Sequence, residues 1–333
     1  MGRIRISLFN WLIMAAVVVA FLWPVQGEAA LRMGQLTTAG VALLFFVHGA
    51  ALPREAVIAG LTQWRLHLFI FSITFVLFPL LVLPLAPLGR AWLPSDLVLG
   101  FLYLGALPSA VSSSIAFTAI ARGNVPAAVC SAAGSNVFGM MLTPVLLSLM
   151  VGSAAEGSFS LVDALRDIVI IMLLPFALGQ AIRPWAANWL DRNKLFSERV
   201  DQAVLLLIIY TAFAQSVTDG LWQNVPTAVL VLAVVLCLLL LALLLALTGW
   251  LSRRLGFPIE DEIAAVFCGS KKSLASGLPM AKVIFAGHPG FGLIVLPIII
   301  YNQVQIIVGA LLAQRYAERR AAGAELQPAP RES

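Results

Sequence analysis

Long apolar runs separated by short polar connections make up most of this chain. A helix that crosses a bilayer needs about 20 mainly apolar residues, and by that length the pattern predicts ten spans. The eighth is almost purely aliphatic, which is typical of a lipid-exposed helix. The predicted spans cover residues 6–24, 34–52, 66–88, 96–121, 124–151, 161–184, 199–218, 225–252, 261–286 and 291–315.

Two of the predicted spans contain polar stretches interrupted by glycine and proline. The fourth contains LGALPSAVSSSIAF (104–117), and the ninth contains FCGSKKSLASGLPMAK (267–282). Polar groups in hydrocarbon need partners, so broken helices of this kind are expected where they line a cavity enclosed by protein. Two such helices in corresponding halves of one chain indicate the substrate site of a secondary transporter.

The two halves match at a shift of 164 residues. The coincident pairs are Pro94 with Pro258, Gly105 with Gly269, Ser109 with Ser273 and Gly123 with Gly287. Since each half holds five spans, an odd number, the halves insert in opposite orientations, as in many carriers. We therefore expect an all-α polytopic membrane protein with one ten-span domain over 1–320, built from inverted repeats at about 1–151 and 160–316. A disordered cytoplasmic tail is expected at 321–333.

The composition supports this class. Hydrophobic residues make up 61% of the 333 residues and charged residues 11%, with a mean hydropathy of +0.97. A soluble domain carries about 25% charged residues. The cysteines Cys130, Cys237 and Cys268 show no metal-ligand spacing and are interpreted as small buried residues.

The basic residues predict an orientation. With the N-terminus in the cytoplasm, fifteen of the 21 lysines and arginines lie on the cytoplasmic side, three lie on the other side and three lie in the ninth span. Positive residues favour the cytoplasm, so both termini are predicted there, in the plasma (inner) membrane of a bacterium. The net charge of +5 then reflects topology, and no nucleic-acid partner is expected. The alternative for the first span is a cleaved signal peptide ending near 27–30.

Hydroxyl and amide side chains gather in the fourth, fifth, ninth and tenth spans. Proline frees a carbonyl one turn earlier, and serines can satisfy such groups or coordinate a cation. Helix packing is the alternative for each serine alone, and an interhelical tie is the alternative for the asparagine of the fifth span. The candidate substrate- or ion-binding residues of this kind are Ser109, Ser112, Ser113, Ser114, Ser135, Asn136, Ser270, Ser273, Asn302 and Gln305.

Lys271 and Lys272 lie about ten residues into the ninth span. A lysine near the bilayer centre costs at least about 2.5–3.5 kcal/mol, so we expect both to face a wet cavity or a helix break. One of them would bind an anionic substrate group, replace a coupling cation or carry a proton. The alternatives are a position at the membrane interface, or a structural role in capping the last carbonyls of a half-helix.

At these residues the chain resembles the bile acid/sodium symporter superfamily (solute carrier family 10), and in particular the bacterial branch related to its seventh vertebrate member. The segment GALPSAVSSSIAFTAIARGNVPAAV (105–129) and the pair Thr143-Pro144 carry the resemblance, which extends over all ten spans. It implies a panel of helices 1, 2, 6 and 7 and a core of helices 3–5 and 8–10. Helices 4 and 9 would be broken and would cross, with organic anions in the panel–core cleft and sodium behind the crossing.

The sodium ligands of that family match only in part. Ser114 corresponds to the serine of helix 4, but Ile115 stands where asparagine is expected, and Ala128 and Ala132 occupy the hydroxyl positions of helix 5. The Glu-x-Gly-x-Gln of helix 9 is replaced by FCGSK (267–271). A lysine ammonium in a cation pocket repels sodium, which argues against the usual two-sodium mechanism.

The function expected from these observations is secondary active transport of a small organic anion by alternating access. Sodium is the favoured coupling ion, with Ser113, Ser114 and Asn136 as its candidate ligands, and no other cofactor is expected. The alternative is a proton-coupled or sodium-independent carrier in which Lys271 replaces the cation. A regulator that does not transport is a further alternative.

No enzymatic activity is expected. Gly269-Ser270-Lys271 lacks the strand and glycine that precede a phosphate-binding motif. A Ser–Lys dyad between Lys271 and either Ser112 or Ser114 would be the catalytic alternative. Membrane lipid is the other expected partner, and the oligomeric state, monomer or homodimer, is left open.

Overall fold

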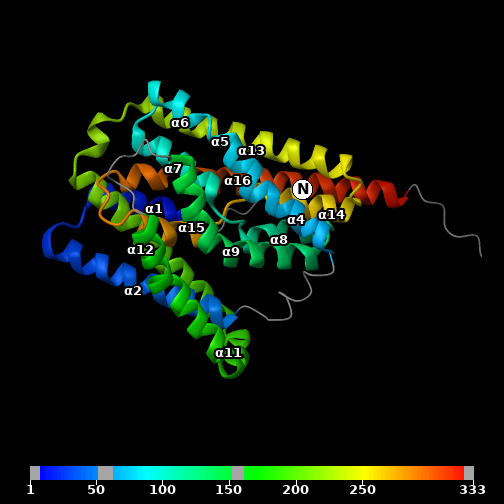
Figure 1. The fold of residues 1–333 in the computed structure, drawn as a ribbon, viewed down its shortest axis with the longest axis horizontal. Coiled ribbons are helices and arrows are strands. Elements are labelled where there is room, and N and C mark those ends of the chain that lie inside the picture. Colours follow the sequence, from blue (N-terminus) through cyan, green and yellow to red (C-terminus); the bar gives the residue numbers. More distant parts are fainter. Residues whose placement is uncertain (1–7, 52–62, 152–160, 326–333) are drawn as a thin grey trace, which may run out of the picture.

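The computed structural model describes residues 8–51, 63–151 and 161–325, and this part of the chain is almost entirely helical (Figure 1). Within it, the extended backbone forms one isolated bridge and no strand. Seven helices of the described part are long and apolar enough to cross a membrane, which confirms an all-α polytopic membrane protein. They are Gly27–Ala51, Trp64–Leu88, Val125–Val151, Leu165–Leu190, Lys194–Thr218, Thr227–Arg254 and Phe291–Arg319.

The two polar spans are each divided into two short helices. α7 (Ser95–Ala106) and α8 (Val111–Ile120) follow one another in the predicted fourth span, and α14 (Ile259–Ser270) and α15 (Leu274–Ile284) in the ninth. Each of these helices is too short to cross a bilayer alone, because 12 residues rise only about 18 Å. The interruptions fall within the glycine-, proline- and serine-containing stretches.

Two other spans contain a π-helical turn. η2 (Ile73–Leu77) lies between α4 (Trp64–Ser72) and α5 (Phe78–Val82). In this turn the N–H of Phe78 donates to the carbonyl of Ile73, five residues earlier. The other turn, η5 (Val169–Leu173), lies between α10 (Leu161–Ile168) and α11 (Leu174–Arg192). In both spans a proline follows shortly after the π turn.

The remaining helices are continuous. They are α1 (Leu8–Leu22), α2 (Gly27–Ala51), α6 (Leu85–Leu88), α9 (Val125–Val151), α12 (Lys194–Thr218), α13 (Thr227–Arg254) and α16 (Phe291–Glu325). α2 begins seven residues before the predicted second span, and α16 extends ten residues beyond the predicted tenth. The first five residues of the predicted tail are thus helical, and 326–333 lie outside the described residues.

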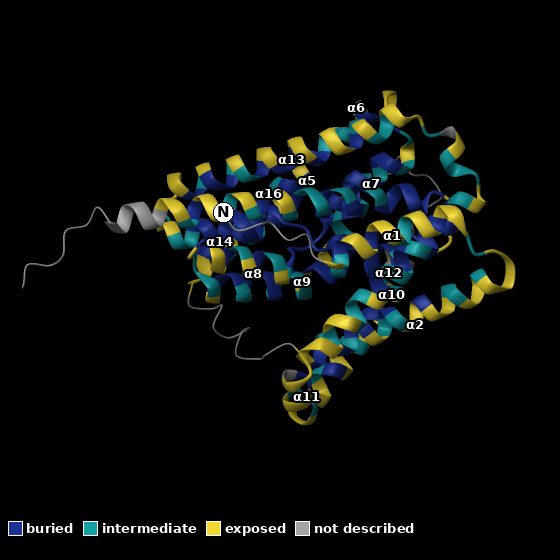
Figure 2. Ribbon diagram, turned by 180° about the vertical axis from the view of Figure 1, so that it is seen from behind, coloured by how far each residue is buried: buried dark blue, intermediate teal, exposed yellow. Residues whose placement is uncertain are grey.

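The helices pack in two groups. α2 packs against α11 and α12, and α1 packs against α12, whereas α7, α8, α9, α13, α14 and α16 pack among themselves together with α4 and α5. Figures 1 and 2 show α2 and α11 inclined away from the second group. α12 lies between these two helices and the second group. We call the first group the panel and the second the core, after the division that the resemblance implies.

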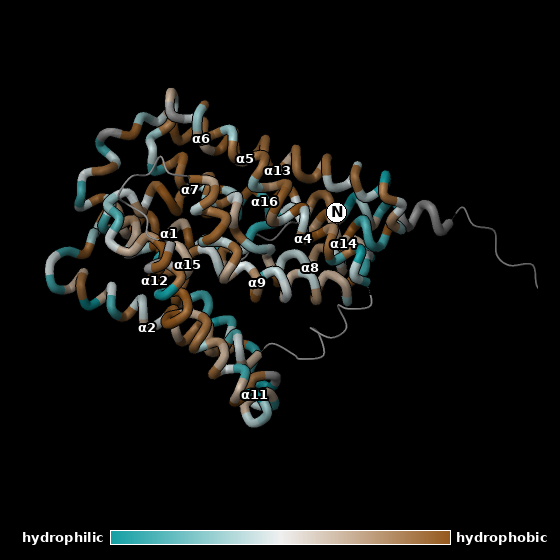
Figure 3. Tube along the Cα trace, in the orientation of Figure 1, coloured by the Kyte–Doolittle hydropathy of each residue, from teal (hydrophilic) through white to brown (hydrophobic). Residues whose placement is uncertain are grey.

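α13 shows how the outer surface is built. Its exposed face carries large aliphatic side chains such as Val231 and Leu239, and its opposite face buries Cys237, Leu241 and Leu244. In Figure 3 the trace of α13 is brown over most of its length, the colour of hydrophobic residues. A helix that is apolar on both faces is stable where lipid replaces water on the outer one, in keeping with the lipid-exposed character predicted for this span.

Candidate functional site

The two helix interruptions lie against each other. Pro108 has no N–H and restricts the residue before it to extended backbone, and Leu107 accordingly has a ψ of 152°. The backbone of Ser109 forms an antiparallel bridge with Lys272. On either side of the bridge, the N–H of Ser273 donates to the carbonyl of Pro108 over 2.9 Å, and that of Ala110 to the carbonyl of Lys271 over 3.3 Å. We call this region, residues 107–110 and 271–273, the crossing.

Side chains of α9 satisfy the backbone of the first interruption. Thr143 Oγ1 donates to the carbonyl of Ala106, the last residue of α7, over 2.9 Å. Ser135 Oγ accepts from the Ser109 N–H over 2.9 Å, and Asn136 Nδ2 donates to the Ser109 carbonyl over 2.8 Å. Three groups left free by the helix break are therefore paired inside the protein, as an apolar surrounding requires.

Side chains of α16 do the same for the second interruption. Tyr301 Oη donates to the carbonyl of Ser270, the last residue of α14, over 2.7 Å. Gln305 Oε1 accepts from the Lys272 N–H over 2.9 Å, and its Nε2 donates to the Lys272 carbonyl over 2.8 Å. Ala106 and Ser270 are separated by the same 164 residues at which the two halves match. In each half, the long helix after the interruption supplies the partners.

Two serines of the first half also pair with the end of α14. Ser109 Oγ donates to the carbonyl of Cys268 over 2.6 Å, and Ser114 Oγ donates to that of Phe267 over 3.0 Å. Both serines are fully buried. Ser270 Oγ instead bonds within its own helix, to the carbonyl of Val266. Ser109 and Ser114 therefore serve as partners of helix-end carbonyls, whereas Ser270 does not.

The two lysines are buried at the crossing, each about 1% exposed. Lys272 Nζ donates to three backbone carbonyls, which is the capping role given above as the structural alternative. Lys271 Nζ lies 3.4 Å from the centre of the Phe117 ring and has no hydrogen-bond partner within the described part of the chain. Among the described residues, Lys271 Nζ makes no hydrogen bond to Ser112 or Ser114, and Ser114 Oγ donates to the carbonyl of Phe267.

A cavity of about 600 Å³ lies between the two groups of helices. One wall is formed by the beginnings of α8 and α15 together with α9 and α16, and the other by α1, α2, α11 and α12. Five of the residues predicted as binding residues line it: Ser112, Ser113, Asn136, Ser273 and Asn302. The other seven are buried away from the cavity lining: Ser109, Ser114, Ser135, Ser270, Lys271, Lys272 and Gln305.

Two half-helix N-termini open into this cavity. Val111, Ser112 and Ser113 form the first turn of α8, and 274–276 form the first turn of α15. The first N–H groups of a helix lack intrahelical partners and carry a partial positive charge. Ser273 Oγ caps one of them, accepting from the Ser276 N–H over 3.1 Å. The others make this wall favourable for a negatively charged group.

The opposite wall carries a residue pair that sequence reasoning missed. His48 Nε2 of α2 lies 3.0 Å from Asp201 Oδ2 of α12, and Glu198 lines the cavity near them. The two partners are 153 residues apart in the sequence, so the pair could not be predicted from local spacing. The one available signal was the position of His48 inside an apolar segment. Ser276 was also missed by sequence reasoning. It lies on the same wall as Asn136, on the crossing side of the cavity, and donates to Asn136 Oδ1.

The three candidate sodium ligands have different surroundings. Ser113 and Asn136 reach the cavity, whereas Ser114 points to α14. Asn136 Oδ1 already accepts from Ser276, and Ser114 Oγ already donates to a carbonyl. Among the described residues, no group of three or more histidine, cysteine or acidic side chains could hold a metal ion either. That Ser113, Ser114 and Asn136 bind sodium stays a prediction.

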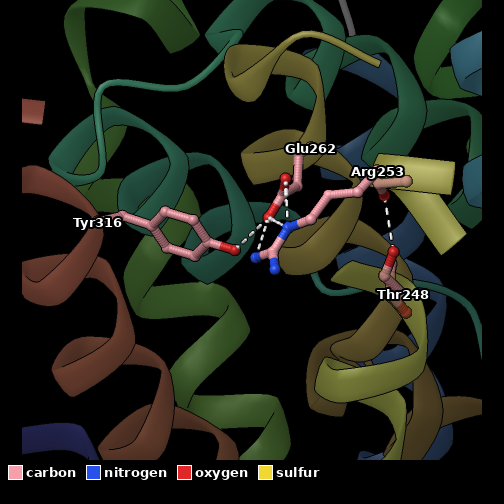
Figure 4. A network of polar contacts seen from close by, with 5 residues as sticks. Thr248, Arg253, Glu262 and Tyr316 are labelled. Carbon is pink, nitrogen blue, oxygen red and sulfur yellow. Dashed lines mark hydrogen bonds and ion pairs between the residues drawn. The ribbon is translucent and has the colours of Figure 1, made fainter. Parts of the chain in front are cut away.

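A second polar network lies at the start of α14 (Figure 4). Glu262, only 3% exposed, accepts from Arg253 Nη2 over 2.8 Å, from Arg253 Nε over 3.0 Å and from Tyr316 Oη over 2.9 Å. The network joins α13, α14 and α16. It therefore holds the N-terminal end of α14, and the C-terminal end of the same helix leads into the crossing.

Comparison with known proteins identifies the family. The sequence model of the SBF-like CPA transporter family matches residues 7–318. An uncharacterized protein of Pseudomonas aeruginosa is 50% identical, covering 97% of this chain and 96% of its own length. The Escherichia coli K12 protein named "Putative symporter YfeH" is 44% identical over 92% of each chain. Sodium/bile acid cotransporter 7 of Rattus norvegicus is 32% identical, covering 93% of this chain and 92% of its own. The predicted resemblance is confirmed.

Proposed function

Since this chain belongs to the SBF-like CPA transporter family, we propose that it is a secondary active transporter that moves a small organic anion by alternating access. One observation carries the choice of an anion: two half-helix N-termini, those of α8 and α15, open into the same cavity. Each supplies unpaired N–H groups and about half a positive charge. The pair favours a carboxylate, sulfonate or phosphate group.

The rest of the cavity has the size and the apolar lining that the uncharged part of an organic anion requires. Its volume of about 600 Å³ lies within the usual range for small-molecule sites, about 300–1,000 Å³. Phe45, Phe176 and Leu205 give an apolar wall on the panel side, and the amides of Asn136 and Asn302 lie on the crossing side. An amphipathic anion would place its charged end at the crossing and its apolar end against the panel.

The arrangement of the two groups supports the proposal of alternating access. We propose ten spans in one domain over 1–320, formed by two inverted five-span repeats, with α7–α8 and α14–α15 each crossing the membrane as one broken span. The core would rock against the panel around the crossing. Phe9, His48 and Glu198 line the cavity, and they lie near the predicted cytoplasmic ends of their helices. In the proposed orientation this structure therefore faces inward.

Two modes of coupling are supported by different observations. Relatives of this chain are named sodium/bile acid cotransporters, which favours sodium as the coupling ion. The two lysines at the crossing favour the alternative, a proton-coupled or sodium-independent carrier, because an ammonium group repels sodium from the same place.

Uptake by purified protein in liposomes tests the proposal. A library of radiolabelled carboxylates and sulfonates is screened by counterflow, with the neutral amide of each active anion as its control. We expect accumulation of the anion and not of the amide. Transport of amides and anions alike would contradict the anion assignment. Imposed sodium and proton gradients on the same liposomes then separate the coupling modes, since only the coupled ion raises the initial rate.

A further inference from the structure

The side chain of Lys272 ends in a cage of oxygen atoms. Its Nζ donates to the carbonyl of Leu107 over 2.6 Å, to that of Gly105 over 2.8 Å and to that of Thr74 over 3.0 Å. The ring of Phe78 covers the group, with its centre 4.1 Å away. An ammonium has three N–H donors, so the three carbonyls satisfy it completely.

Each of these carbonyls is free for a structural reason. Gly105 and Leu107 belong to the end of α7, where the last carbonyls of a helix have no intrahelical donor and carry partial negative charge. Thr74 belongs to the π turn η2, where bonds join residues five apart. The residue five after Thr74 is Pro79, which has no N–H.

The cage thus exists because of the backbone and not because of Lys272. Three converging carbonyls at a helix C-terminus, closed by an aromatic face, are the surroundings that bind a soluble monovalent cation in a membrane protein. Here the chain itself supplies the cation, on a side chain that is about 1% exposed.

We propose that the carbonyls of Thr74, Gly105 and Leu107 form a monovalent-cation site that the Lys272 ammonium fills as a tethered ion. The proposal deepens the proposed carrier function, because a site filled by the chain needs no ion from solution. Shortening Lys272 empties the site and makes the fold depend on a soluble cation.

The test is the thermal unfolding of Lys272→Ala in nanodiscs, with chloride salts exchanged at constant ionic strength. Methylammonium replaces the lost end of the side chain, and tetramethylammonium has the same charge but no N–H donor. In choline chloride we expect a lower Tm than that of the wild type. Methylammonium, and sodium to a smaller extent, raise the Tm saturably, by roughly 2–4 °C at a tenfold excess over Kd. Tetramethylammonium has no such effect.

Lys271→Ala is the matched control, since it removes the neighbouring lysine, whose Nζ lies against Phe117 with no carbonyl partner in the described structure. Sodium should leave its Tm unchanged. Lys272→Met fills most of the space and should not respond to methylammonium.

Equal responses of Lys272→Ala and Lys271→Ala to sodium and methylammonium would overturn the proposal. So would a failure of these cations to recover folded Lys272→Ala when they are present throughout extraction. Because the readout is unfolding, it is independent of transport, and the cage and the carrier function can fail separately.

Discussion

The N–H of Ser273 donates to the carbonyl of Pro108 over 2.9 Å, and this bond joins the two interrupted helices. The bridge between Ser109 and Lys272 lies next to it. The centre of the molecule is therefore held by main-chain bonds between residues far apart in the sequence. Side chains of α9 and α16 form hydrogen bonds with the backbone N–H and carbonyl groups of Ser109 and Lys272.

Replacing Gln305 by leucine should destabilise the fold. The change removes both partners of the Lys272 backbone, and each buried group left unpaired costs about 1–3 kcal/mol. Thermal unfolding in nanodiscs measures the loss. Gln303→Leu is the control on the same helix, because Gln303 Nε2 is buried without a partner in the described structure. Equal losses in the two variants would show that Gln305 does not support the crossing.

A carboxylate placed at the start of α8 should compete with the substrate anion. In Ser113→Asp, the new negative charge lies at the third residue of the half-helix, on the cavity wall, and takes up the N–H groups proposed for the substrate. We expect the Kd of a transported anion to rise at least about tenfold, which corresponds to 1.4 kcal/mol. Ser113→Asn, similar in size and uncharged, should change it much less. Unchanged affinity in Ser113→Asp would place the anion elsewhere.

Substitution of Arg253 should destabilise the fold more than substitution of its partner Glu262. The Glu262 side chain is 4% exposed and that of Arg253 is 62% exposed. Arg253→Met therefore leaves a buried carboxylate with one donor, Tyr316, at a cost of about 1–3 kcal/mol. Glu262→Gln leaves an arginine that water can solvate. Unfolding of both variants gives the comparison, and a larger loss in Glu262→Gln would contradict this account.

A cysteine at position 112 should report which side of the membrane the cavity faces. Ser112 is exposed and lines the cavity, and Cys237 and Cys268 are buried, so Cys130→Ser gives a quiet background. In the proposed orientation, a maleimide that cannot cross membranes labels Ser112→Cys in inside-out vesicles and not in right-side-out vesicles. A transported anion should slow the labelling. Labelling only from the outside would reverse the proposed orientation.

The sequence predicted where the helices break but not which way the polar side chains point. Pro108 and the flanking glycines and serines indicated the interruptions directly. In extended backbone, successive side chains point to opposite sides, so Lys271 meets Phe117 of α8 and Lys272 meets the end of α7. A shift of one residue in the bridge would exchange their roles, and no local pattern determines that register.

Long-range pairs were also beyond sequence reasoning. Asn136 could be recognised as an amide that needs partners, but its bond to Ser276 depends on how α9 and α15 pack. The pairing of His48 with Asp201 depends likewise on the packing of α2 and α12. The cage around Lys272 required a π turn, and residue types alone do not specify where such a change in hydrogen-bond register occurs.

The main-chain bonds at the crossing have a consequence for the evolution of this family. Because Pro108, Ala110, Lys271 and Ser273 hold each other through their backbones, substitutions at the centre can alter its chemistry while the scaffold persists. Phe267 and Lys271 of this chain, and the glutamate and glutamine that the resemblance implies at these positions, are then compatible with a single architecture. Divergence in what these proteins carry, and in what drives them, can proceed by a few point changes at the centre of the molecule.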